Sequence, residues 1–164
     1  ASRYPNKIKT LSLMGGAGAI PMNSELLALA ENSDPKAVDL MMDFAHGPSG
    51  HFGGHPVPGL YHLNTGSMLV QSKEIKDTLG VDFRACENYT NGFEAANKLD
   101  LPTLSILADK DRMCRLKDGQ KLADHIKGSE VHVIKNCGHM MLLEEADQTL
   151  AILKKFILDK YPIT

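Results

Sequence analysis

Two acids and one histidine stand where the sequence could place chemistry. Asp109 and Asp111 follow the apolar run 103–108, and His139 follows the β-branched run 130–135 and a glycine. A carboxylate that accepts a hydrogen bond from one ring nitrogen of a histidine fixes its tautomer, so the other nitrogen can act as a base. Such a pair is two-thirds of a nucleophilic triad. Taken alone, these residues are also compatible with a turn histidine and helix-capping acids.

The segments around these residues predict βα units on a mostly parallel sheet. Apolar or β-branched runs bounded by turn residues indicate strands, and apolar residues at steps of three or four indicate helices. The predicted strands are 8–16, 101–111 and 130–136, and the predicted helices are 116–126 and 139–161. Strand, helix, strand, helix at this spacing is typical of an α/β fold. If the second and third strands are neighbours, the acid and the histidine project from the ligand-binding edge of the sheet.

A long stretch, residues 20–98, separates the first predicted strand from the second. The predicted helices in it are 34–46, 67–79 and 87–99. We expect Asp34 to cap the first of these helices, with Pro35 as its first helical residue and Gly47 at its end. A loop rich in glycine, proline and histidine follows across 47–59. The pattern predicts a helical insertion after the first strand.

The composition is that of an ordinary globular protein. Of the 164 residues, 43% are hydrophobic and 23% are charged, which is enough for one domain with a core. The formal net charge of −2 argues against a nucleic-acid partner. No apolar run approaches the ~20 residues that span a bilayer, so no membrane partner is expected. Three widely spaced cysteines without a CxxC pair favour a reducing compartment, and hence a cytoplasmic location, over a disulfide frame or a zinc site.

Other candidate sites have simpler interpretations. The histidines of the loop region are His46, His51, His55 and His62. Their spacings match no common metal-ligand pattern, so we expect a structural loop, no metal and no other cofactor. The GGAGA segment at 15–19 lacks the residues of a phosphate loop and is interpreted as a tight turn. Most methionines are expected in the core, with a lining of an adaptable apolar pocket as the alternative for those of the helical insertion. Cys114 and Cys137 are expected to be inert thiols.

Three segments together resemble the C-terminal half of an α/β-hydrolase-fold enzyme. They are ASRYPNKIKTLSLMGGAG (1–18), LPTLSILADKDRM (101–113) and NCGHMMLLEEADQTLAILKKFI (136–157). The second resembles the family's acid-bearing strand, which puts the triad acid on Asp111. The third resembles its closing Gly-His segment, which puts the triad base on His139. Glu144 matches the acid of that segment and is interpreted as a helix-start residue, not a catalyst.

The match has two departures from the family's pattern. Ala108 stands where glycine is usual, and Ala146 stands where a proline is frequent. Both positions are peripheral to the chemistry.

The resemblance implies a division of the chain: residues 1–19 as a strand of the hydrolase core, 20–98 as a helical cap or lid, and 99–164 as the C-terminal core. The family's nucleophile stands in a Gly-x-Ser-x-Gly elbow, and no such segment occurs in the sequence. The nearest is GPSGHFGG, where the glycines around Ser49 have the wrong spacing. We therefore expect a nucleophilic serine upstream of Ala1, a small ester or related acyl substrate, and no turnover by this chain alone.

Two alternatives stay open. An aspartate in the upstream elbow would indicate dehalogenase or epoxide-hydrolase chemistry with the same acid and base. A non-catalytic half-domain or fragment is the other alternative. Because loss of the first strands would expose a sheet edge and apolar helix faces, such a chain is expected to self-associate.

Overall fold

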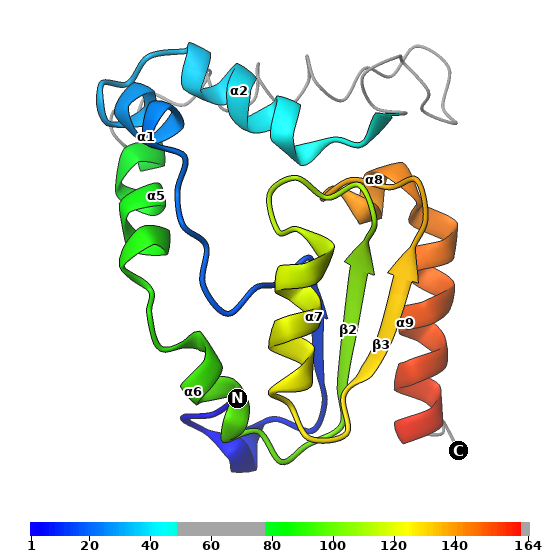
Figure 1. Cartoon of the computed structure of the whole chain (residues 1–164). Coiled ribbons are helices and arrows are strands. Elements are labelled where there is room, and N and C mark those ends of the chain that lie inside the picture. Colours follow the sequence, from blue (N-terminus) through cyan, green and yellow to red (C-terminus); the bar gives the residue numbers. More distant parts are fainter. Residues whose placement is uncertain (49–77, 162–164) are drawn as a thin grey trace.

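The computed structural model describes residues 1–48 and 78–161, and it is an α/β fold with a parallel sheet (Figure 1). Its strands are β1 (Leu11–Met14), β2 (Thr103–Ala108) and β3 (Glu130–Ile134). Their order in the sheet is β1-β2-β3, and both pairs are parallel. The predicted fold class is confirmed, and the three predicted strands form within the predicted segments.

Strand β2 is the centre of the core because it is buried on both faces. All six of its residues are buried, as expected for a strand inside a parallel sheet covered by helices. Leu104 and Ile106 point to the face covered by α9 (Ala146–Lys160), where they pack with Phe156. Leu107 points to the opposite face, where its side chain lies against Gly119 of α7 (Leu116–Asp124). The alternation of side chains along the strand thus gives each helix one face of the sheet.

A helical layer lies beyond the carboxyl ends of the strands. It consists of α1 (Ser24–Glu31), α2 (Lys36–Ala45) and α5 (Thr78–Asn88). In Figure 1, α2 runs across the top, α1 lies at the upper left, and α5 runs down the left side below α1. The apolar side chains that hold this layer together include Leu26, Leu27, Ala30, Ala37 and Phe83. The layer has its own small core, separate from the core around β2.

The caps of these helices follow local sequence rules. The Asn23 side chain accepts a hydrogen bond of 2.9 Å from the Leu26 amide at the start of α1. Asp34 accepts one of 2.9 Å from the Lys36 amide, but α2 begins at Lys36 with Pro35 as its N-cap, so the predicted cap lies one residue too early. Side-chain oxygens at these positions satisfy amides that have no partner inside the helix.

Two helix predictions were wrong in their boundaries. The predicted helix 87–99 is two helices, because α5 runs to Asn88 and α6 spans Gly92–Asn97. The predicted helix 139–161 divides into α8 (Met141–Glu144) and α9, with the non-helical residue Glu145 between them. The hydroxyl of Thr149 stabilises this second break by donating to the carbonyls of Met141 and Glu145. Most of the loop 47–59 and of the predicted helix 67–79 lies outside the described residues.

Candidate active site

Asp111 and His139 meet at the carboxyl edge of the sheet. Asp111 follows β2, His139 follows β3, and the imidazole Nδ1 lies 2.8 Å from the carboxylate Oδ2. The Asp111 side chain is 0% exposed, whereas that of His139 is 25% exposed. A carboxylate can only accept, so Nδ1–H donates and the proton-free nitrogen is Nε2. The structure thus brings together the two residues that the sequence singled out.

The other oxygen of Asp111 is fixed by the backbone. Its Oδ1 accepts hydrogen bonds of 2.8 Å from the amide of Met113 and 2.8 Å from the amide of Cys114. These two donors hold the carboxylate plane in place. The acid is therefore pre-oriented toward the imidazole by its own loop.

Asp109 has a different position from Asp111. Its Oδ1 accepts a hydrogen bond of 2.7 Å from the amide of Asn136, a residue with a φ of 55° in the turn after β3. The backbone adds two links between the same loops, from the Asp109 amide to the Ile134 carbonyl (3.1 Å) and from the Lys110 amide to the Cys137 carbonyl (3.0 Å). Asp109 therefore supports the turn that leads to His139 and does not contact the imidazole through any of these bonds.

Gly15 is a site residue that the sequence analysis missed. It follows β1 with a φ of +58°, and a Cβ placed on it would lie 2.8 Å from both Cε1 and Nδ1 of His139. The same atom would lie 3.3 Å from Asp111 Oδ2. Only glycine leaves room for the paired side chains and adopts this backbone without strain. The one signal in the sequence is the Gly-Gly pair directly after the strand.

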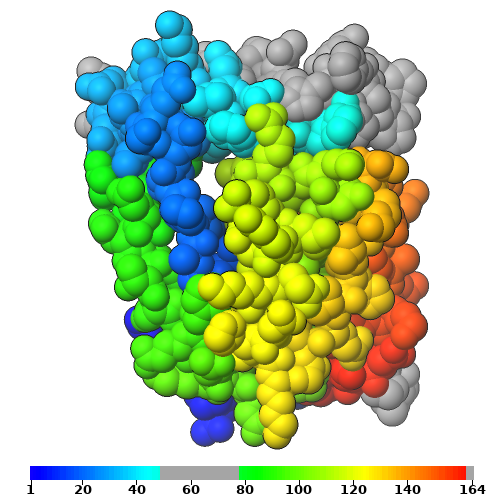
Figure 2. Space-filling model, viewed as in Figure 1, coloured from blue at the N-terminus to red at the C-terminus, as the bar shows by residue number. Residues whose placement is uncertain are grey.

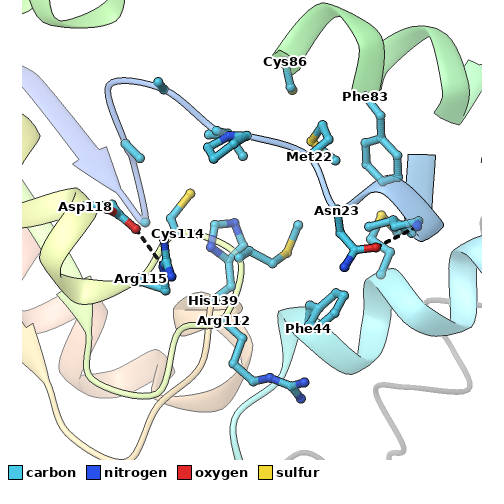
Figure 3. Close-up of a pocket in the computed structure, with 18 of the residues that line it drawn as sticks. Met22, Asn23, Phe44, Phe83, Cys86, Arg112, Cys114, Arg115, Asp118 and His139 are labelled. Carbon is cyan, nitrogen blue, oxygen red and sulfur yellow. Dashed lines mark hydrogen bonds and ion pairs between the residues drawn. The ribbon is translucent and has the colours of Figure 1, made fainter. Parts of the chain in front are cut away.

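A pocket of about 520 Å³ lies between the helical layer and the sheet edge, with His139 in its wall (Figure 3). Most of its other lining is apolar, and the methionines and large apolar side chains in it are Met14, Met22, Met41, Met113, Ile20, Leu26, Phe44 and Phe83. The methionines were expected mostly in the core. Met42 and Met141 are indeed buried there, but four others line this pocket.

The two arginines of the pocket are each paired with an aspartate. Arg112 lies 3.1 Å from Asp43 and stacks over the Phe44 ring at 4.8 Å from its centroid. Arg115 lies 2.9 Å from Asp118, and Figure 3 shows this pair on the far side of His139 from Phe83. Because each guanidinium already has a counter-charge, the pocket offers an apolar surface and not an anion site.

The two buried thiols near the site are protonated. Burial raises the pKa of the Cys114 thiol to about 12, and the Asp111 carboxylate adds to the rise. Burial also raises the pKa of Cys137 to about 12, with Glu144 contributing next. A thiol that does not ionise is a poor nucleophile, so neither cysteine competes for that role.

Among the other candidate residues from the sequence, the structure describes His46 but not Ser49 or the remaining loop histidines. His46 is buried, and its Nδ1 donates to the Met42 carbonyl at 3.1 Å. Within residues 1–48 and 78–161, no group of three or more potential ligands could hold a metal ion, and no helix is long and apolar enough to cross a membrane.

Similarities to known proteins extend over the whole described chain. No family model matches the sequence. The proline iminopeptidase of Lactobacillus crispatus (strain ST1) is 33% identical over 64 residues, which are 39% of this chain and 22% of that protein. A solved thermophilic esterase matches at 25% identity with a TM-score of 0.77, over 97% of this chain and 60% of that one. The enol-lactonase from Burkholderia xenovorans LB400 matches at 18% identity with a TM-score of 0.81, over 96% and 59%.

The chain therefore spans about three-fifths of the solved structures that it matches. Its overall fold is shared with proteins that are 25% and 18% identical to it, at TM-scores of 0.77 and 0.81. The sequence match to the iminopeptidase is independent of the structural comparison. The chain has the α/β-hydrolase fold, and its sequence match to the iminopeptidase covers 39% of it.

Proposed function

We propose that this chain is the C-terminal part of an acyl hydrolase in which His139 is the general base and Asp111 orients it. The observation that carries the proposal is the 2.8 Å contact between His139 Nδ1 and the fully buried Asp111 carboxylate, beside a pocket that His139 itself lines. The nucleophile is a serine contributed by residues outside this chain. The expected cytoplasmic location remains a prediction.

The reaction follows from this geometry. His139 Nε2 takes the proton of the serine hydroxyl while the serine oxygen attacks the acyl carbonyl carbon. The imidazolium that forms is stabilised by the Asp111 carboxylate, which stays ionised. His139 then gives the proton to the leaving group, the carbon–leaving-group bond breaks, and an acyl-enzyme remains. A water molecule, deprotonated by the same nitrogen, releases the acid and restores the serine.

The pocket supports a neutral, mainly apolar acyl group. Methionine side chains are flexible and fill irregular spaces, so their presence around the pocket suits acyl groups of more than one shape. Both pocket arginines are already paired, so a carboxylate on the substrate gains little there. Residues 20–98 would act as the cap over this pocket, between the strand of residues 1–19 and the core of residues 99–164.

Hydrolysis of p-nitrophenyl esters by the full-length protein tests the proposal. We expect turnover of acetyl to medium-chain esters, and none by the His139→Ala variant. Thermal unfolding of the variant provides the control for folding. A full-length wild-type protein that hydrolyses none of these esters, nor a lactone or an amino-acid amide, would overturn the proposal.

Aspartate-nucleophile chemistry remains the runner-up for the same base and acid. Its test is turnover of haloalkanes and epoxides by the same preparation. The solved structures named above are an esterase and a lactonase, which favours acyl transfer over this alternative.

A second proposal concerns the chain in isolation, which we propose self-associates. In the described part of the chain, β1 pairs only with β2, so its other edge is open. Three apolar residues at seven-residue spacing, Leu143, Leu150 and Ile157, are 38%, 62% and 43% exposed. Sedimentation of the isolated chain over a range of concentrations tests this. We expect an oligomer that Leu150→Glu weakens, and a monomer at every concentration would contradict it.

A further inference from the structure

The end of α2 and the loop before His139 pack backbone against backbone. A Cβ placed on Gly47 would lie 2.6 Å from the Gly138 amide nitrogen and 2.7 Å from Glu144 Oε2. One placed on Gly138 would lie 2.6 Å from the His46 carbonyl carbon and would also meet the Gly47 nitrogen. Neither position leaves room for a side chain. The two glycines therefore permit a contact that fixes the distance between the helical layer and the histidine loop.

Four hydrogen bonds hold this contact together. Glu144 Oε2 accepts from the amides of Gly47 (2.8 Å) and Gly138 (3.0 Å). The carbonyl of Ala45 accepts from the amides of His139 (2.8 Å) and Met140 (3.2 Å). The sequence analysis interpreted Glu144 as a helix-start residue, but it is the last residue of α8 and reaches back to two loops. We call this arrangement the Glu144 bridge.

We propose that Glu144 is a positioning residue for His139, acting through the backbone on both sides of the bridge. The amides of Gly138, His139 and Met140 all donate to it or to Ala45, so three consecutive residues are fixed around the imidazole. Asp111 holds the ring from the other side. This inference rests on the proposed function for its catalytic consequence, but the bridge itself is a feature of the fold.

The bridge also connects the base to the pocket. Met41 and Phe44 of α2 line the pocket, and the same helix ends at Ala45, whose carbonyl holds the His139 loop. An acyl group that presses on α2 therefore acts on the element to which the base is attached. Through the bridge, the position of the His139 ring depends on the position of α2 relative to the sheet.

The chemistry of the bridge calls for a carboxylate of this length. An ionised oxygen that accepts two amide hydrogens forms stronger hydrogen bonds than a neutral acceptor. Glutamine keeps an oxygen at the same reach, so Glu144→Gln should retain most of the geometry. Alanine removes the acceptor and leaves two partly buried amides without it. Glu145 offers the matched control, because its carboxylate is not among the four bonds.

The experiment uses the full-length protein with ¹⁵N-labelled histidine and follows both the His139 Nδ1–H signal and ester hydrolysis. For Glu144→Ala we expect that signal to broaden or vanish, and kcat to fall on the order of a hundredfold with KM nearly unchanged. Glu144→Gln should restore the signal and most of kcat. Glu145→Ala should resemble the wild type. A merely structural residue would lower the melting temperature and leave the signal of the folded protein intact.

A second variant keeps the proposal testable if Glu144→Ala does not fold. Gly47→Ala pushes on the bridge from the helical layer and should broaden the same signal. A folded Glu144→Ala or Gly47→Ala protein with an intact signal and wild-type kcat would overturn the proposal. Failure of the proposed function is distinguishable, because a wild-type protein inactive on all esters still reports the bridge through the Nδ1–H signal.

Discussion

The sheet edge and the helical layer meet at the pocket, and they hold their residues by different means. On the sheet side, the Asp111 carboxylate has three hydrogen-bond partners and is fully buried. On the helical side, the pocket is lined by apolar side chains such as Met22 and Met41, and methionine is an unbranched residue that adapts to irregular spaces. Figure 2 shows α1 and α2 along the top of the molecule and α5 down its left side, with a gap between these helices and the part that contains α7. Under the proposed function, we expect the chemistry to depend on the sheet side and the substrate preference to depend on the helical side.

The largest effect should come from the two aspartates after β2. Asp111→Asn removes the acceptor that fixes the imidazole tautomer and should lower kcat/KM roughly ten-thousandfold in the full-length protein. Asp109→Asn is the matched control, because its oxygen receives only the Asn136 amide and an amide side chain can still accept there. Steady-state ester hydrolysis measures both. Equal losses would show that the catalytic acid has been misassigned.

A methyl group added at Gly15, directly after β1, tests the position of the His139 ring without changing any charge. Gly15→Ala would place its Cβ against His139 and force a φ that alanine rarely adopts, so kcat should fall on the order of a hundredfold. Gly16→Ala is the control, because its Cβ would find ordinary contacts of 3.6 and 3.7 Å. A Gly15→Ala enzyme with normal kcat would mean that His139 can move aside without loss.

Substitutions of pocket residues in the helical layer should change KM and leave kcat nearly unchanged. Met41→Ala removes apolar surface from the pocket, so KM for a medium-chain ester should rise roughly tenfold, and less for an acetyl ester. Val81→Ala, on the exposed side of α5, should leave both values unchanged. Kinetics across a series of acyl lengths measures the difference. A fall in kcat alone would contradict the division between the two sides.

The smallest expected effects are the reactivity of the three thiols and their contribution to the free energy of unfolding at high pH. Cys86 is partly exposed, so a maleimide should label it in the folded protein, whereas Cys114 and Cys137 are buried and should react only after unfolding. Because their folded-state pKa of about 12 lies above the ordinary value of 9.0, the unfolded state releases protons first as the pH rises. The free energy of unfolding should therefore decrease above pH 9. Urea unfolding at two pH values checks this, and replacing both buried cysteines by alanine should remove that part of the decrease.

The features that the sequence predicted well are local. An apolar run followed by acids locates β2 and the pair Asp109 and Asp111, and a β-branched run followed by Gly-His locates β3 and His139. The choice of Asp111 over Asp109 came from the family resemblance. Those segments carry their own burial pattern, so no knowledge of distant partners was needed.

The features that it missed depend on contacts between distant segments. Gly47 and Glu144 are 97 residues apart, and nothing in either segment shows that they are bonded. Helix α5 contains Gly80 because its backbone packs against α1, where a Cβ would lie 2.9 Å from the Glu31 Cα. Such a helix is set by tertiary packing, so its weak local pattern led to the wrong boundary.

The most direct test of the central claim is covalent labelling of the full-length protein by a fluorophosphonate, followed by intact mass. The account predicts one label on the wild-type protein, on a serine outside this chain, and a strongly slowed reaction for His139→Ala. An unlabelled wild-type protein, or a His139→Ala variant labelled at the wild-type rate, would contradict a serine activated by His139.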